Sequence, residues 1–285
     1  RVSRDVLDVG RDPDVDVLVE LIGGTTVALD LIKLAIQQGK HVVTANKALI
    51  AEHGNELIAM AEAAGVQIRY EAAVAGGIPV IKVLRESLAA NAVTEVAGII
   101  NGTGNFILTE MSTKGRAFED VLSEAQALGY AEADPTFDID GTDAAHKLVI
   151  LASLAFGIPL SIDATMKQGI QEVAPEDLEC AASMGYRVKH LGIARRTEQG
   201  IEMRVHPTLI PERKQIATVD GVLNAVMISG DAVGEVVLVG PGAGGAATAS
   251  AVCADLVDVA RNPAGSGPAL GIAAVTLQAP NWVPV

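Results

Sequence analysis

The densest group of residues able to do chemistry lies between Glu132 and Lys147, where five carboxylates precede one lysine. Asp143 and Lys147 are four positions apart in a predicted helix over residues 143–156, so their side chains share one face of it. Lys147 also begins the apolar run 148–151, and a lysine against a desolvated wall beside carboxylates has a tunable pKa. This combination suits proton transfer, and the extra carboxylates suit a substrate that carries an ammonium group.

The carboxylate stretch has two other interpretations. Asp140 or Thr142 could cap the helix, and the helix dipole would stabilise Asp143 in the first turn, which leaves a capped helix with an ion pair. The carboxylates could instead hold a hard cation such as Mg²⁺ for phosphoryl transfer, but the sequence has no GxxxxGK[ST] phosphate loop. No Ser or Cys nucleophile motif accompanies His146, so we expect it to fill the core or the helix surface rather than act as a base. His190 and His206 lie in a predicted hairpin and are expected to be structural.

Two short polar segments each follow a predicted strand. Residues 23–26 (GGTT) follow the predicted strand 15–22, and residues 44–47 (TANK) end the predicted strand 41–44. In open α/β sheets ligands bind beyond the carboxyl ends of the strands, which is where both segments would lie. Lys47 is therefore placed to contact a ligand. The alternative is a solvated loop lysine after a strand.

Two glycine-rich turns are further candidates. Residues 240–245 (GPGAGG) match GxGxxG between a predicted strand and a predicted helix over 246–260. No following strand with an acidic residue completes a βαβ unit, so a helix-packing turn is favoured over a pyrophosphate cradle. Its bare backbone could still approach a flat cofactor ring. The turn over residues 71–79 combines one carboxylate with several carbonyls, which can coordinate a monovalent cation, although an ordinary turn is favoured.

The elements around these residues predict an α/β fold in two parts. In the first part, short β-rich runs alternate with helical ones: strands over 15–22, 41–44 and 66–71, and helices over 28–38 and 57–64. Strands separated by helices must pair in parallel with right-handed crossovers, so this part resembles half of a doubly wound sheet.

The second part changes character after residue 75. Its predicted elements are helices over 78–89, 118–128 and 143–156, a strand over 93–100, and hairpins of 186–197 with 201–210 and 222–228 with 234–239. Helices followed by antiparallel strands indicate an α+β arrangement.

The composition excludes several classes of partner. Lys and Arg number 21 against 35 Asp and Glu, and the net charge of −14 disfavours binding to nucleic acid. No apolar run reaches the roughly 20 residues that span a bilayer, and the first residues do not form a secretory signal, so we expect a cytoplasmic protein without a membrane partner. Cys180 and Cys253 lack metal-site spacing and are expected to be small core hydrophobes.

Taken in order, the motifs resemble those of homoserine dehydrogenase over most of residues 13–262. The matching segments are TANK at 44–47, EAAVAGGIP at 71–79, NGTGNF at 101–106, GYAEADPTFD at 129–138, VHPT at 205–208, DGVLNA at 220–225 and GPGAGG at 240–245. The resemblance implies NAD(P)-dependent interconversion of L-homoserine and L-aspartate 4-semialdehyde, in the pathway to threonine, methionine and isoleucine.

The resemblance also implies roles for the residues of the acidic stretch. Lys147 would give a proton to the substrate carbonyl oxygen, and Lys47 would contact the cofactor and assist catalysis. Glu132 and Asp143 would bind the amino-acid substrate, and Asp138 would line the same pocket.

The remaining roles concern the cofactor and a cation. Thr25 and Gly244 would contact the cofactor, and a sodium ion would be held by Glu71 with the carbonyls of Val74, Gly76 and Ile78. The family's first strand and its N-terminal GxGxxG loop have no counterpart in these residues, so the cofactor affinity of this chain stays open, and so does the choice of NAD or NADP.

These observations predict a partial Rossmann-like domain over residues 1–75, rejoined by 240–262. A second α+β domain over 76–239 would bind substrate and form a homodimer or tetramer, and residues 263–285 would be a tail. The rival hypotheses are another NAD(P)-dependent oxidoreductase of a small amino-acid aldehyde, a catalytically silent oligomerisation or binding module, and the metal-dependent phosphoryl-transfer enzyme.

Overall fold

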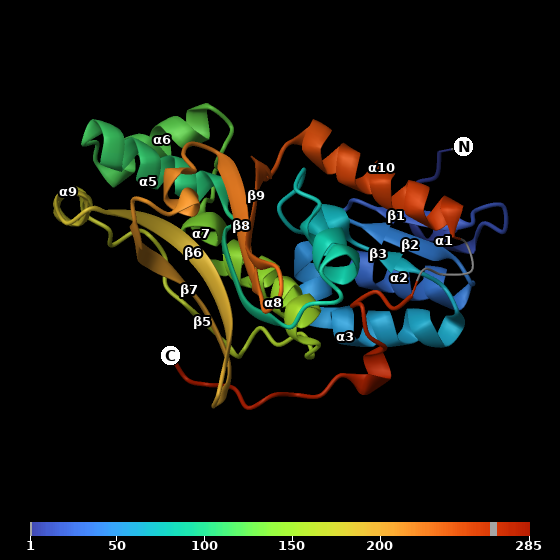
Figure 1. Cartoon of the computed structure of the whole chain (residues 1–285). Helices are drawn as coiled ribbons and strands as arrows, with labels where there is room; N and C mark the ends of the chain where they lie inside the picture. The colour runs from blue at the N-terminus through green and yellow to red at the C-terminus, as the bar shows by residue number, and fades with distance from the viewer. Residues whose placement is uncertain (1, 263–266) are drawn as a thin grey trace.

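The first of two sheets consists of three short parallel strands, in the order β1-β2-β3. They are β1 (Val17–Glu20), β2 (His41–Thr44) and β3 (Ile68–Arg69), preceded by α1 (Leu7–Arg11) and connected by α2 (Val27–Gln37) and α3 (Lys47–Ala64). Val17 pairs with His41, and Val42 pairs with Ile68. The computed structural model describes residues 2–262 and 267–285, and it confirms the alternation of parallel strands and helices (Figure 1).

Helix α3 begins ten residues earlier than the sequence pattern predicts. The Asn46 side chain caps it by accepting a hydrogen bond of 3.1 Å from the backbone N–H of Leu49. Gly54 lies inside the helix where it packs on Leu160. A larger residue would clash there, because a Cβ at Gly54 would lie 2.6 Å from a Leu160 methyl carbon. The early start makes Lys47 the first residue of the helix, at the carboxyl edge of the sheet.

The chain leaves the first sheet through a compact turn. It passes η1 (Glu71–Ala73), the single turn α4 (Val80–Lys82) and the π-helical η2 (Val83–Ser87) before β4 (Val93–Ile99). The sequence predicts one regular helix over 78–89. The structure instead widens it after Lys82, where the N–H of Leu88 donates to the carbonyl of Val83.

The second sheet has six strands in the order β5-β7-β6-β4-β8-β9. Its strands besides β4 are β5 (Thr165–Lys167), β6 (Tyr186–Thr197), β7 (Gly200–Pro211), β8 (Leu223–Gly230) and β9 (Gly234–Pro241). Strands β6 and β7 form a hairpin with Thr197 opposite Gly200, and β8 and β9 form a second hairpin with Gly230 opposite Gly234. Both predicted hairpins are confirmed, and the short 3₁₀ helix η3 (Gln215–Thr218) connects β7 to β8.

Helices cover one side of this sheet. They are α5 (Gly102–Lys114), α6 (Phe118–Ala127), α7 (Thr136–Ile139), α8 (Thr142–Phe156) and α9 (Pro175–Ser183). The sequence pattern predicts α6 and α8 but not α5, whose apolar periodicity is weak. Helix α8 packs on β4 and β6 and also on α3, so a single buried cluster runs from the first sheet through α8 to the second.

After β9 the chain returns to the first sheet as α10 (Gly245–Arg261). This helix packs on β2 and η1, on the side of the sheet opposite α2 and α3 (Figure 1). Strand β9 is antiparallel to β8 and belongs to the second sheet, so residues 240–245 are not part of a βαβ unit. Gly242 lies directly against the Asn224 side chain of β8, which leaves no room there for a Cβ.

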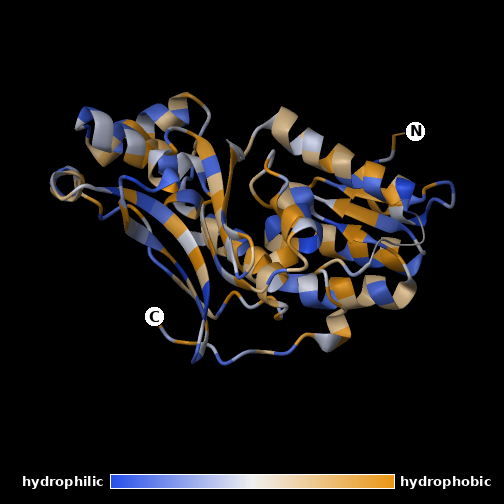
Figure 2. Cartoon of the chain, in the orientation of Figure 1, coloured by the Kyte–Doolittle hydropathy of each residue, from blue (hydrophilic) through white to orange (hydrophobic). Residues whose placement is uncertain are grey.

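The pattern of apolar residues along the strands differs between the parallel and the antiparallel sheet. Figure 2 shows hydrophobic colour concentrated in the strands of the first sheet and alternating along β6, as expected for parallel and antiparallel strands. Cys180 on α9 and Cys253 on α10 are exposed, so their predicted place in the core is wrong.

The end of the chain runs back toward the β6–β7 hairpin. It includes η4 (Ala274–Thr276), and the N–H of Val283 donates to the carbonyl of Ile201. Of the predicted tail, residues 263–266 lie outside the described residues. No helix in the described ranges is long and apolar enough to cross a membrane.

Candidate functional site

A cleft of about 560 Å³ lies where the start of α3, the start of α8 and the turn before α10 meet. It brings together six of the residues singled out from the sequence: Lys47, Glu132, Asp138, Asp143, Lys147 and Gly244. These residues come from five separate elements or loops and span almost 200 positions of the chain. Thr25, Glu71, Val74, Gly76 and Ile78 are not among the residues that line the cleft.

Asp143 is the common partner of both lysines. One carboxylate oxygen lies 2.7 Å from Nζ of Lys147, and the other lies 3.1 Å from Nζ of Lys47. Burial of Asp143 opposes its ionisation, but the two ammonium groups outweigh burial and lower the pKa of the carboxyl to about 2. Asp143 is therefore an anion in the folded protein, and its charge fixes the positions of both ammonium groups.

The ammonium group of Lys147 is held in place with one donor to spare. Its Nζ donates to the carbonyl oxygen of Ile100 and to Asp143, both at 2.7 Å. An ammonium group has three N–H donors, so within the described part of the chain one of them remains for an acceptor in the cleft. The Lys147 side chain is 12% exposed, which means that such an acceptor would meet it with little competing water.

Asn101 connects half-buried Asp138 with buried Asp143, a role that the sequence pattern did not reveal. Its Nδ2 donates to Asp138 at 2.9 Å and to Asp143 at 2.8 Å. Its Oδ1 caps α5 by accepting from the N–H of Gly104 at 2.7 Å. The signal available in the sequence was an Asn directly before a short Gly/Thr segment, which is typical of a helix N-cap.

Two carboxylates remain available for a ligand. Burial raises the pKa of Asp138 above its ordinary value, and the neighbouring Asp143 charge adds to this effect. Glu132 is exposed at the rim, and its carboxylate makes no hydrogen bond or ion pair with other residues that the structure describes. Glu132 can therefore meet a cation from solvent without first losing a partner.

The N-terminus of α8 is built differently from either predicted cap. Its N-cap is Gly141, in the left-handed region with φ of 88°, and no side chain caps from that position. The Asp140 carboxylate still accepts from the N–H of Thr142 at 2.8 Å, so it serves the first turn from one residue earlier.

The histidines fit their predicted role as packing residues. His146 is buried on α8 against the ring of Phe137, with 5.3 Å between ring centroids, and burial lowers its pKa. His190 is buried in β6 and contacts the carbonyl of Gln168 at 2.9 Å.

The loops after β1 and β2 are tied together at the edge of the first sheet. Buried Glu20 accepts from the N–H groups of Ile22 and Gly23 and from the Thr44 hydroxyl, at 2.7 to 3.0 Å. Asn46 Nδ2 also donates to the carbonyl of Gly24 at 2.7 Å. The loop that carries half-buried Thr25 is thereby held beside the start of α3.

The turn after β3 carries the residues of the expected cation site. The Glu71 carboxylate is buried and accepts from the N–H groups of Ile81 and Lys82, both at 2.9 Å, and burial raises its pKa to about 7. The carboxylate is thus already used by α4. Within the described ranges, the carbonyls of Val74 and Gly76 accept no hydrogen bond, and no three His, Cys, Asp or Glu side chains gather at a metal site.

Comparison with known proteins agrees with this geometry. The family model described as homoserine dehydrogenase matches residues 79–257, and the model described as its NAD binding domain matches residues 1–71. The chain belongs to the homoserine dehydrogenase family. The homoserine dehydrogenase of Pseudomonas aeruginosa is 63% identical over 260 residues, which are 91% of this chain and 60% of that protein. The Bacillus subtilis homoserine dehydrogenase is 46% identical, over 92% of this chain and 60% of that protein.

Solved structures of the homoserine dehydrogenase family share the fold. A homoserine dehydrogenase from Thiobacillus denitrificans matches with a TM-score of 0.94 and 58% identity, covering 97% of this chain and 65% of that one. A hyperthermophilic archaeal homoserine dehydrogenase in complex with NADPH matches with a TM-score of 0.80 and 31% identity, covering 92% and 76%. The chain spans about 60% of the length of the curated relatives it matches.

Proposed function

We propose that this chain carries the catalytic site of an NAD(P)-dependent homoserine dehydrogenase, which interconverts L-homoserine and L-aspartate 4-semialdehyde. One observation carries the proposal: Lys147 is fixed in the cleft by Asp143 and the Ile100 carbonyl and retains a free donor. A fixed ammonium group with a spare N–H suits a carbonyl oxygen that becomes an alkoxide. Membership of the family supports the same reaction.

The proton transfer follows from this arrangement. In the reducing direction, the spare N–H of Lys147 donates to the substrate carbonyl oxygen and passes its proton as negative charge develops there. In the oxidising direction, neutral Lys147 takes the hydroxyl proton. A bound nicotinamide would supply the hydride to the carbonyl carbon in the reducing direction and would accept it in the other. Asp143 holds the Lys147 ammonium group in place without itself exchanging a proton, because the pKa of Asp143 is about 2.

The substrate ammonium group is assigned to the carboxylates of the cleft. Glu132 is free to form an ion pair with it, and Asp138 offers the carboxylate oxygen that Asn101 does not use. Asp143 contributes to substrate binding mainly through the two lysines that it holds. These residues would select a substrate with an α-amino group over a plain hydroxy acid.

For the cofactor, Thr25, Lys47 and Gly244 are the proposed contacts. A Cβ at Gly244 would meet no atom within 4 Å, so the backbone there presents an open, flat surface to the cleft. Such a surface fits a planar nicotinamide ring. Lys47 lines the same cleft from the start of α3. The loop that carries Thr25 lies at the carboxyl edge of the sheet, where dinucleotides bind in this class of fold.

A sodium ion is the second proposed ligand. The carbonyls of Val74 and Gly76 are the best candidates to hold it, with the carbonyl of Ile78 beside them. Glu71 would shape this turn through its contacts with α4 rather than bind the ion through its carboxylate.

We further propose that the two parts of the chain, each built around one sheet, bind different ligands. Residues 1–75 with 240–262 would bind the cofactor, and residues 76–239 would bind the substrate and a second copy of the chain in the cytoplasm.

The test follows the absorbance of the reduced nicotinamide while full-length enzyme is given L-homoserine with NAD or NADP. Turnover should require homoserine and should be absent with the same hydroxy acid lacking its amino group. Equal turnover of that analogue would favour another small-alcohol oxidoreductase. A folded protein that is silent with both cofactors would support the binding or oligomerisation module instead.

A further inference from the structure

One wall of the cleft is a short loop between η3 and β8. Val222 and Leu223 line the cleft from this loop, next to Gly102 at the start of α5. The contact is close, because a Cβ at Gly102 would lie 2.8 Å from the carbonyl oxygen of Val222. A shift of this loop would therefore change the shape of the cleft beside Asn101, which holds the aspartates.

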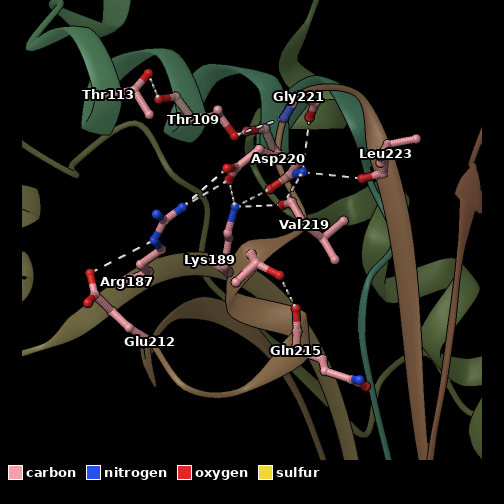
Figure 3. A network of polar contacts seen from close by, with 12 residues as sticks. Thr109, Thr113, Arg187, Lys189, Glu212, Gln215, Val219, Asp220, Gly221 and Leu223 are labelled. Atoms are coloured by element: carbon pink, nitrogen blue, oxygen red, sulfur yellow. Dashed lines mark hydrogen bonds and ion pairs between the residues drawn. The ribbon is translucent and has the colours of Figure 1, made fainter.

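The loop is held from behind by two buried residues that do not line the cleft. Lys189 on β6 donates to the carbonyl of Val219 at 2.7 Å and to the Asp220 carboxylate at 2.8 Å, as Figure 3 shows. Its third donor reaches Oδ1 of Asn105 on α5 at 3.2 Å. The three N–H donors of a buried ammonium group are thus all directed at this loop and its support.

Asn105 adds further contacts to the same loop, and we call the contacts of Lys189 and Asn105 with residues 219–223 the clamp. Nδ2 of Asn105 lies within hydrogen-bond distance of three carbonyls of the loop, those of Val219, Gly221 and Leu223, at 2.9 to 3.2 Å. The hydroxyl of Thr109, one turn further along α5, accepts from the N–H of Gly221. Side chains from α5 and β6 therefore hold the backbone of this loop at Val219, Gly221 and Leu223.

The clamp is costly, which points to a role beyond neutralising Asp220. Lys189 is only 2% exposed, and burial lowers its pKa while contact with Asp220 opposes the change. Arg187 already pairs with Asp220 at 3.2 Å near the surface, so the aspartate does not need a second, buried cation. A fully satisfied buried polar network keeps its members in one arrangement.

We propose that Lys189 and Asn105 are positioning residues for the reaction: they hold residues 219–223 so that Val222 and Leu223 keep the substrate cleft in one shape. The inference rests on the proposed function. Lys147 and Asp143 are held by Ile100 and Asn101, outside the loop, so loss of the clamp should disturb substrate fit more than proton transfer.

The experiment compares Lys189→Met and Asn105→Ser with the unmodified full-length enzyme. Each should raise KM for L-homoserine and lower kcat/KM about tenfold or more, while kcat and the KM of the cofactor change much less. Hydrogen exchange of residues 219–224 should become faster, whereas exchange in α8 should stay unchanged. Because both variants act through one loop, the double variant should lose little more than the worse single one.

The matched control is Lys214→Met, which removes an exposed lysine paired with Glu235 next to the same loop. It should leave all kinetic constants unchanged. Folded Lys189→Met and Asn105→Ser enzymes with normal KM would overturn the clamp, and so would a loss confined to thermal stability. Absence of homoserine turnover in the unmodified enzyme would overturn the proposed function and the clamp together.

Discussion

Replacing Lys147 by methionine removes the ammonium group proposed to exchange the proton while keeping the apolar stem of the side chain. The loss of fold stability should be moderate, because Asp143 retains the Lys47 ammonium and the Asn101 amide as partners. The losses are one charged hydrogen bond to Asp143 and one to the carbonyl of Ile100. We expect these to lower the free energy of unfolding by about 1–3 kcal/mol.

The effect on turnover should be much larger than the effect on stability. A positioned acid or base contributes roughly 10²- to 10⁴-fold to the rate, which equals about 3–5 kcal/mol of activation free energy. We expect the upper part of this range, because two fixed acceptors at 2.7 Å orient Lys147 before substrate binds. In solution, Lys147→Met should therefore lower kcat strongly and change the KM of the cofactor little.

The assay is steady-state reduction of NADP by L-homoserine, with thermal unfolding measured on the same samples. Lys114→Met serves as the control, because it removes an exposed lysine paired with Glu110 on α5, away from the cleft. A Lys147→Met enzyme that folds normally and turns over at nearly the rate of the control would refute the assignment. A fall in kcat matched by an equal fall in folded protein would also refute it.

Three further predictions test other parts of the site. Asp143→Asn removes the anion shared by both lysines and should lower kcat about 100-fold, measured in the same assay. Gly242→Ala should lower the free energy of unfolding by about 1–3 kcal/mol in urea titrations, because the added methyl group would overlap the Asn224 side chain. Burial raises the pKa of Asp255 to about 6, so the folded state binds its proton more tightly than the unfolded state. Stability from this group is present below about pH 4 and lost as pH rises through 6. Asp255→Asn should remove this pH-dependent loss of unfolding free energy, which amounts to about 3 kcal/mol. An unchanged pH dependence of stability would contradict the prediction.

The local pattern of the sequence was sufficient for much of the fold. Alternating strands and helices before residue 75 predicted the parallel sheet, and both hairpins of the second sheet followed from turn residues between β-rich runs. The spacing of Asp143 and Lys147 alone predicted their ion pair, because residues four apart on a helix are neighbours. Such features depend only on residues close together in the chain.

Tertiary contacts decided the rest. Asn101 lies 42 positions before Asp143, and nothing in either segment signals that the amide would hold the carboxylate. Asp143, to which the resemblance assigns substrate binding, contacts two lysines, one of them 96 positions away. The exposure of Cys180 also depends on which face of α9 meets the sheet. Sequence periodicity reports local preference, whereas the partners of a buried polar group are chosen by how distant elements pack.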